Sequence, residues 1–268
     1  MDIKSPVIVT ALYDIGRDTW EKFNQSYGGY LHWMERTLSL NSNMVIYTQQ
    51  KFKSEIEEVR KKYDPNFTKT IIVIEELEDL VVYKRYHNWL KHVMYSDTFK
   101  NKVSFHDVPE MCKPLYNVIM FNKVFWLKDT ADNGYFNNDL VIWADAGGLR
   151  EDVIKYENVT WPSLEKINQL DNSKITFFSH NENFEITDKE FYSLSQIRNI
   201  QGTAFFVPSR LTVFLVNQFT STIDESLESF YIGSDEKVFD ISYLKSPNRY
   251  HLIKSTWREY YDIFKPEN

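Results

Sequence analysis

Six short runs of apolar residues, rich in β-branched side chains, constrain the fold of this chain more than any other feature of its sequence. Each run has the length of a buried strand and is too short for a buried helix. Between the runs, apolar residues recur every three or four positions over residues 20–38, 52–63 and 113–128, which is typical of amphipathic helices. The predicted strands are Val7–Leu12, Met44–Thr48, Thr70–Ile74, Leu140–Trp143, Ile175–Phe178 and Ala204–Val207.

Strands that alternate with helices predict an α/β fold. Helical connections join parallel strands by right-handed crossovers, so we expect a single Rossmann-like domain with a central, mostly parallel sheet flanked by helices. Ser209 and Ser234 each precede a further helical pattern, and residues 257–264 are also predicted to be helical. The 268 residues contain no repeat and no Pro/Gly/Ser-rich linker, so one domain is predicted over residues 1–268.

Composition excludes several classes of protein. Hydrophobic residues make up 43% and aromatic residues 16% of the chain, which excludes intrinsic disorder. The formal net charge of -7 predicts no nucleic-acid partner, because phosphate backbones are bound by clustered cations. The single cysteine, Cys112, cannot close an internal disulfide, and the first apolar run is too short for a signal peptide or a membrane span. We therefore expect a cytoplasmic protein without a transmembrane segment.

Ligands of open α/β sheets bind beyond the carboxyl ends of the strands, so polar residues that follow a predicted strand are the first candidates for a site. Tyr13, Asp14 and Arg17 follow the first strand. Tyr13 offers a face for stacking on a base, Asp14 can accept hydrogen bonds from a ring or a ribose, and Arg17 can pair with a phosphate. The alternative is an ordinary strand-to-helix turn in which Asp14 or Asp18 caps the helix.

A second candidate follows the predicted strand Leu140–Trp143. Asp145 stands two residues after this strand, and Gly147 and Gly148, which allow a close approach, precede Arg150. One aspartate at a strand end can hold Mn²⁺ or Mg²⁺ when substrate phosphates supply further oxygen ligands. The alternative is a strand-ending turn in which Asp145 bonds to its own backbone.

A third candidate combines the adjacent acids Asp235 and Glu236, at a predicted helix start, with the downstream His251. Acids in a first turn also interact favourably with the helix dipole, and an isolated histidine is commonly a core or surface residue, so structural roles are the alternative. The other histidines show no metal-binding i, i+4 spacing. The dinucleotide, P-loop and α/β-hydrolase motifs are absent from the sequence.

Taken together and in this order, these segments resemble the HtrL/YibB protein family, whose members are similar to nucleotide-sugar-dependent glycosyltransferases of the GT-A type. The similarity extends over nearly the whole chain. The resembling blocks are residues 9–17, residues 116–126 with Asn122 and Lys123, residues 143–150, residues 202–206, and the pair Asp235 and Glu236.

The resemblance implies a GT-A-like domain that binds a UDP-sugar donor at the end of the first strand. Tyr13, Asp14 and Arg17 would then lie around the nucleotide. Lys123 and Arg150 would neutralise the charge of the donor phosphates.

The resemblance also implies a divalent cation, Mn²⁺ or Mg²⁺, that bridges the donor phosphates to the protein. Asp145 would take the place of the metal-binding aspartate in the DxD signature of GT-A enzymes, and His251 would be a further ligand. Trp143 stands where the first aspartate of that signature falls, so this sequence departs from the pattern.

For the sugar itself, the resemblance implies that Gly202 lines the donor-sugar pocket and that Asp235 or Glu236 contacts sugar hydroxyls or acts as the catalytic base. The resulting hypothesis is a glycosyltransferase that moves a sugar from a UDP-sugar to a glycan or protein acceptor. Two alternatives stay open: a non-catalytic nucleotide-sugar or glycan-binding protein on the same fold, and a nucleotidyltransferase that activates sugars.

Overall fold

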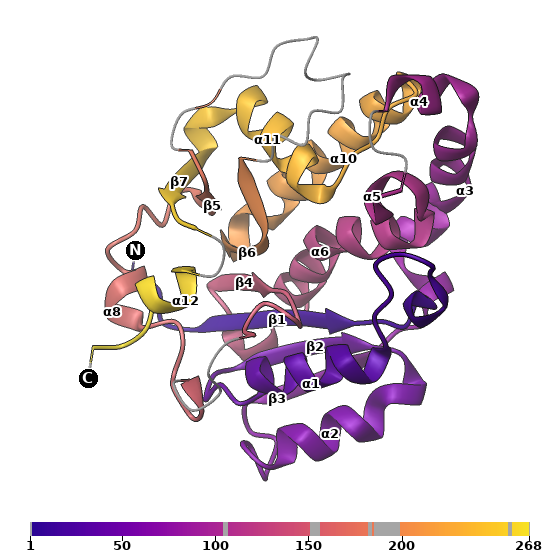
Figure 1. The fold of residues 1–268 in the computed structure, drawn as a ribbon. Helices are drawn as coiled ribbons and strands as arrows, with labels where there is room; N and C mark the ends of the chain where they lie inside the picture. Colours follow the sequence, from indigo (N-terminus) through magenta and orange to yellow (C-terminus); the bar gives the residue numbers. More distant parts are fainter. Residues whose placement is uncertain are drawn as a thin grey trace.

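A seven-stranded sheet forms the centre of the molecule (Figure 1). The computed structural model describes residues 2–103, 107–150, 156–181, 184, 199–256 and 259–267. The strands follow one another across the sheet in the order β3-β2-β1-β4-β6-β5-β7. Their bounds are β1 Pro6–Leu12, β2 Met44–Thr48, β3 Thr70–Ile74, β4 Leu140–Ala144, β5 Ile175–Ser179, β6 Ile200–Pro208 and β7 Tyr250–Lys254.

One strand of this sheet runs against its neighbours. β6 is antiparallel to β4 and to β5, whereas the other neighbouring pairs are parallel. Ala144 at the end of β4 therefore pairs with Ala204, the middle residue of β6, and the first half of β6 extends beyond the carboxyl end of β4. The amino end of β6 lies beside the carboxyl end of β4, and both ends contribute to the same edge of the sheet. The predicted fold class, α/β with a central, mostly parallel sheet flanked by helices, is confirmed.

Alternate residues of β1 enter two different hydrophobic cores, as the two-residue period of a strand requires. Val7 and Val9 pack with α3, α6, α10 and α11 on one face, whereas Ile8 and Leu12 pack with α1, α2, α8 and α12 on the other. The α-helices are α1 Tyr27–Leu38, α2 Lys53–Lys61, α3 Val81–Tyr95, α4 Asp97–Lys102, α5 Pro109–Cys112, α6 Pro114–Asp132, α8 Leu164–Ile167, α10 Thr212–Glu228, α11 Asp235–Lys245 and α12 Glu259–Ile263. Short 3₁₀ turns are η1 Arg17–Thr19, η2 Gln50–Phe52, η3 Leu77–Asp79, η4 Tyr135–Asn137, η5 Ser209–Leu211 and η6 Pro247–Arg249.

The structure corrects some predicted boundaries. The helix predicted from residue 20 begins only at Tyr27, where the Ser26 hydroxyl accepts a hydrogen bond from the Gly29 amide, because the chain is extended at Trp20 and has a positive φ at Phe23. β7 is not among the predicted strands, because His251 interrupts its short apolar run. In the predicted helix 257–264, residues 257 and 258 lie outside the described residues, and α12 covers the following segment.

Helix α6 matters most for the position of the site. It starts with Pro114 in its first turn, as predicted, and it packs against α3 and α10 as well as against β4 and β1. Because neighbours surround it on nearly all sides, even Asn122 and Lys123 are buried. No helix in the described parts of the chain combines the length and the apolar character that crossing a membrane requires.

Candidate functional site

A cavity of about 530 Å³ opens at the edge of the sheet where β1 and β4 end and β6 begins. Its wall comes from the segments after β1 and β4, from α1 and α6, from the start of β6 and from the start of α11. Nine of the predicted site residues line it: Tyr13, Asp14, Arg17, Lys123, Asp145, Arg150, Gly202, Asp235 and Glu236. The structure therefore brings together residues that lie far apart in the sequence.

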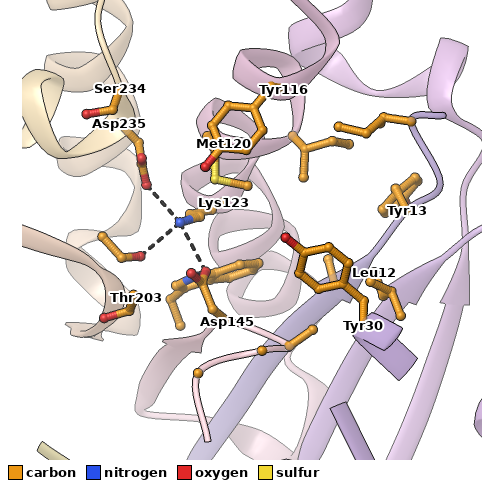
Figure 2. A pocket seen from close by; sticks show the side chains of 18 of the residues that line it. Leu12, Tyr13, Tyr30, Tyr116, Met120, Lys123, Asp145, Thr203, Ser234 and Asp235 are labelled. Carbon is orange, nitrogen blue, oxygen red and sulfur yellow. Dashed lines mark hydrogen bonds and ion pairs between the residues drawn. The ribbon is translucent and has the colours of Figure 1, made fainter. Parts of the chain in front are cut away.

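Lys123 contacts three other residues that line the cavity (Figure 2). Its ammonium group donates to the carbonyl oxygen of Gly202 at 2.9 Å and to Oδ2 of Asp235 at 2.8 Å, and it forms an ion pair with Oδ1 of Asp145 at 3.0 Å. An ammonium has three N–H bonds, so these acceptors match its full donor capacity. Burial alone lowers the pKa of Lys123, but the two carboxylates more than offset this effect and raise the pKa above its usual value.

Asp145 is oriented by a tryptophan two residues before it. Nε1 of Trp143 donates to Oδ1 of Asp145 at 2.6 Å, the same oxygen that faces Lys123. The indole itself is stacked on Trp126, with ring centroids 5.7 Å apart, and the ammonium of Lys123 lies 5.6 Å from the Trp143 ring. Burial raises the pKa of Asp145, although Lys123 and the indole N–H oppose the shift. The carboxylate of Asp145 is thus held by side chains, whereas the alternative placed it on its own backbone.

Gly202 is required by sterics. A Cβ at this position would lie 2.4 Å from Oδ2 and 3.0 Å from Cγ of Asp235, both far inside contact distance. Only glycine lets β6 pass this close to the start of α11 while its carbonyl oxygen accepts from Lys123. The sequence pointed to Gly202 only through the family resemblance, and the structure supplies the physical reason.

Asp235 and Glu236 occupy the first turn of α11, where acids also suit the helix dipole. The two carboxylates have different surroundings. Asp235 is 3% exposed and is committed to Lys123, whereas Glu236 lines the cavity beside Gly202 and lies 3.4 Å from the hydroxyl of Ser234. The first turn of α11 is therefore compatible with both predictions for these acids, an interaction with the helix dipole and a role at the site.

The turn after β1 is stabilised by Asp14, but neither Asp14 nor Asp18 caps a helix, since Gly16 precedes η1 and Ser26 caps α1. Oδ1 of Asp14 accepts from the amide of Gly16, whose φ is 71°, and Oδ2 pairs with Lys51 at 3.1 Å. These two contacts hold the pKa of Asp14 below its usual value even though partial burial opposes the shift. Tyr13 stacks on Trp126 with ring centroids 5.4 Å apart, and burial raises the pKa of its hydroxyl. Asp14 lines the cavity, but its carboxylate also stabilises the turn.

Two guanidinium groups line the cavity near Tyr30. Arg17 donates to this hydroxyl through Nη1 and to the carbonyl oxygen of Phe23 through Nε, and its guanidinium lies 5.3 Å from the Tyr30 ring. Arg150 lies 4.0 Å from the ring of Trp33 and donates through Nε to the carbonyl oxygen of Gly147. Burial raises the pKa of Tyr30, and the charges of both arginines counteract it. Aromatic faces thus hold both cations at the cavity wall.

His251 does not join this group. It is the second residue of β7 and pairs with Thr176 of β5, so it does not lie at the carboxyl end of its strand. Three strand spacings, roughly 14 Å, separate β7 from β4 and hence from Asp145. The structure therefore does not bring the two predicted metal ligands together.

Several residues that line the cavity were missed. His180 directly follows β5, and its position after a strand was the available signal, although only helical spacing was considered for it. Gln201 and Thr203 lie in the first half of β6, before the predicted strand. They reach the site because β6 runs in the opposite direction, which no local sequence pattern reveals.

The fold and the cavity define an α/β protein with a mixed cationic and acidic site at the strand ends. The chain belongs to the HtrL/YibB family: the family model described as "Bacterial protein of unknown function (HtrL_YibB)" matches residues 4–266, which confirms the resemblance. Protein HtrL of Escherichia coli (strain K12) is 22% identical over 273 residues, which cover 97% of this chain and 92% of that protein.

Two solved structures are similar to this chain. Mouse xyloside xylosyltransferase 1 in its apo form superposes with a TM-score of 0.49 at 11% identity, covering 97% of this chain and 92% of that one. The 4-diphosphocytidyl-2C-methyl-D-erythritol synthase of Anaerococcus prevotii DSM 20548 superposes with a TM-score of 0.41 at 12% identity, covering 95% of this chain and 88% of that one.

Proposed function

We propose that this chain is a glycosyltransferase that takes a sugar from a nucleotide-sugar donor of the UDP-sugar type. One observation carries the proposal: a single cavity joins two arginines, Arg17 and Arg150, to an acidic group at the start of α11, Asp235 and Glu236. A nucleotide sugar has the matching polarity, since it combines a doubly charged diphosphate with a neutral sugar rich in hydroxyl groups. Guanidinium groups suit the first part and carboxylates suit the second.

The donor can be oriented by groups that are already in place. Arg17 forms no ion pair with a carboxylate among the residues that the structure describes, so its charge can serve an incoming diphosphate. Gln201 donates through Nε2 to the carbonyl oxygen of Ser255 at 2.7 Å, while its buried Oε1 has no hydrogen-bond donor within the described parts of the chain. Since Gln201 lines the cavity, this oxygen is available to a sugar hydroxyl.

The proposed reaction requires these side chains to stabilise the leaving group and to accept a proton from the acceptor hydroxyl. As the bond from the anomeric carbon to the diphosphate oxygen breaks, Arg17 and Arg150 stabilise the negative charge that develops on the leaving group. As the acceptor oxygen bonds to that carbon with inversion, a carboxylate takes the hydroxyl proton. We assign this role to Glu236, because Asp235 is committed to Lys123.

The sequence also predicted Mn²⁺ or Mg²⁺, and the described residues do not form a donor set that fits such an ion. No group of three or more His, Cys, Asp or Glu side chains converges within the described ranges. Oδ1 of Asp145 already faces both Lys123 and the indole of Trp143. No step of the proposed reaction is therefore routed through a metal.

The test is release of nucleoside diphosphate from a panel of UDP- and GDP-sugars, first with water as acceptor. We expect release from one donor, and we expect Glu236→Gln to reduce it by about a hundredfold or more while UDP affinity changes little. Lys245→Gln, which removes an exposed partner of Glu225 at the other end of α11, is the matched control.

The other outcomes identify the alternatives. Release of pyrophosphate would assign a nucleotidyltransferase. Binding of UDP without turnover of any donor, with or without added glycans, would assign a binding protein and overturn the proposal.

A further inference from the structure

We infer that Lys123 is the permanent cation of this site and that the chain binds its diphosphate ligand without a divalent metal. The inference rests on the proposed function only for the identity of that ligand. The observation behind it is the position of the ammonium group, directly between Asp145 and Asp235 (Figure 2).

A metal shared by these two acids needs the place that Lys123 occupies. Magnesium and calcium bind carboxylate oxygens at about 2.0–2.6 Å, so a bridging ion lies between the oxygens that it joins. In this chain the oxygens of Asp145 and Asp235 that face each other lie 3.0 and 2.8 Å from the ammonium nitrogen. A second cation at that point would meet both steric exclusion and charge repulsion.

Lys123 is also held too firmly to step aside. Its side chain is 2% exposed, and it projects from the middle of α6, which other elements surround. The carbonyl oxygen of Gly202 provides a third contact at 2.9 Å. Moving the ammonium away would leave the buried Asp235 and the partly exposed Asp145 without their counter-charge, which is costly above all for Asp235.

Three of the acids around the cavity already have a cationic partner in the protein. Four acids line it, Asp14, Asp145, Asp235 and Glu236, against three cations, Lys123, Arg17 and Arg150. Asp14 is additionally neutralised by Lys51. Asp145 and Asp235 share Lys123, and Arg17, which pairs with no carboxylate in the described parts of the chain, can face the diphosphate.

Lys123 is a positioning residue in this scheme. With three protein acceptors, it acts through its charge and through the placement of Asp145 and Asp235, and it need not touch the ligand. This role predicts that its removal creates a metal site where the native chain has none. Two acids of low exposure that lose their ammonium become a pair of oxygen donors for a hard cation.

The first measurement uses the native chain and two probes, UDP and Mn²⁺. We expect calorimetry to give the same UDP affinity within about threefold after treatment with chelator and in ~1 mM Mn²⁺. We also expect titration of Mn²⁺ alone, followed by electron paramagnetic resonance, to show no bound ion at that concentration. Micromolar Mn²⁺ binding that disappears in Asp145→Asn, or UDP affinity that rises about tenfold or more with Mn²⁺, would overturn the inference.

The second measurement uses Lys123→Ala and its matched control Lys128→Ala. Lys128 lies on the same helix, is partly exposed and pairs with Asp132. We expect Lys123→Ala to bind Mn²⁺ at least tenfold more tightly than the native chain, the added change Asp235→Asn to abolish this binding, and Lys128→Ala to bind none.

The two proposals fail in different ways. If Lys123→Ala does not fold, the native chain still decides the inference through its own Mn²⁺ titration. If UDP binds to no form of the protein, the proposed function fails, whereas the Mn²⁺ titrations continue to decide the role of Lys123.

Discussion

The two cationic parts of the cavity are built in opposite ways. Arg17 and Arg150 are supported by aromatic faces and by bonds to carbonyl and hydroxyl oxygens. Lys123 is buried between two carboxylates and a carbonyl oxygen. An aromatic face holds a cation without neutralising it, whereas a carboxylate neutralises it. Under the proposed function, Arg17 therefore keeps its charge for an incoming anion, whereas Lys123 balances and positions the acids of the site itself.

Removing the buried cation is expected to have the largest effect. Lys123→Met should lower the free energy of unfolding by about 3–5 kcal/mol, because the buried Asp235 and the partly exposed Asp145 lose their partner. Urea denaturation measures the change, and Lys128→Met, which breaks a more exposed pair on the same helix, should cost under about 1 kcal/mol. Equal effects of the two substitutions would contradict the comparison.

The close approach of β6 to α11 gives the next largest effect. Gly202→Ala should cost about 1–3 kcal/mol, because the new methyl group must displace Asp235 from Lys123. Gly28→Ala is the matched control, since a Cβ there meets nothing within 4 Å in helix α1. This control should stabilise the protein by up to about 1 kcal/mol. Thermal unfolding of both variants tests the contrast, and an unchanged unfolding temperature in Gly202→Ala would contradict it.

Replacing Arg17 should affect ligand binding more than stability, whereas replacing Lys123 should mainly affect stability. Arg17→Gln should weaken UDP binding by about 10- to 100-fold, the value of one charged hydrogen bond, and should change the free energy of unfolding by less than about 1 kcal/mol. Arg249→Gln is the control, because Arg249 also lies over an aromatic ring, that of Phe214, but does not line the cavity. An unchanged UDP affinity in Arg17→Gln would remove Arg17 from the ligand site.

The smallest effect concerns a second buried acid of α11, Asp240, whose carboxylate accepts from the amides of Asn199 and Ile200. Burial raises its pKa to about 6. Because this pKa lies above that of the unfolded chain, the stabilising contribution is complete at low pH and is lost as the pH rises through about 6. Between about pH 7.5 and 5.5 the native chain should gain about 1 kcal/mol relative to Asp240→Asn. Unfolding curves that shift equally with pH in both proteins would contradict this assignment.

The sequence predicted the central strands because buried strands are nearly continuous apolar runs, as in Met44–Thr48 and Leu140–Ala144. It missed β7 at the sheet edge and the first half of β6, where Gln201 and Thr203 interrupt the apolar pattern. Those two residues are polar because they line the cavity. The polar lining of the cavity therefore obscured the strand pattern of this segment.

The candidate site was predictable in part for a similar reason. Asp145 stood out because it follows a strand, but the hydrogen bond from Trp143 and the three contacts of Lys123 depend on tertiary packing. Helical spacing placed Lys123 on the same face as the apolar residues of the predicted helix, but only the family resemblance gave it a role at the site. His251 was assigned by analogy to a late histidine, whereas the histidine that lines the cavity is His180.

The stacked rings of Tyr13, Trp126 and Trp143 provide an intrinsic spectroscopic signal beside the site. The rings of the two tryptophans are nearly parallel, 11° apart, and Trp143 contacts Asp145 through its indole N–H. Closely stacked indoles couple their electronic transitions, so a small rotation of Trp143 changes both near-ultraviolet circular dichroism and fluorescence. Binding of a ligand that moves Asp145 should therefore change the near-ultraviolet circular dichroism and the fluorescence of the unlabelled protein.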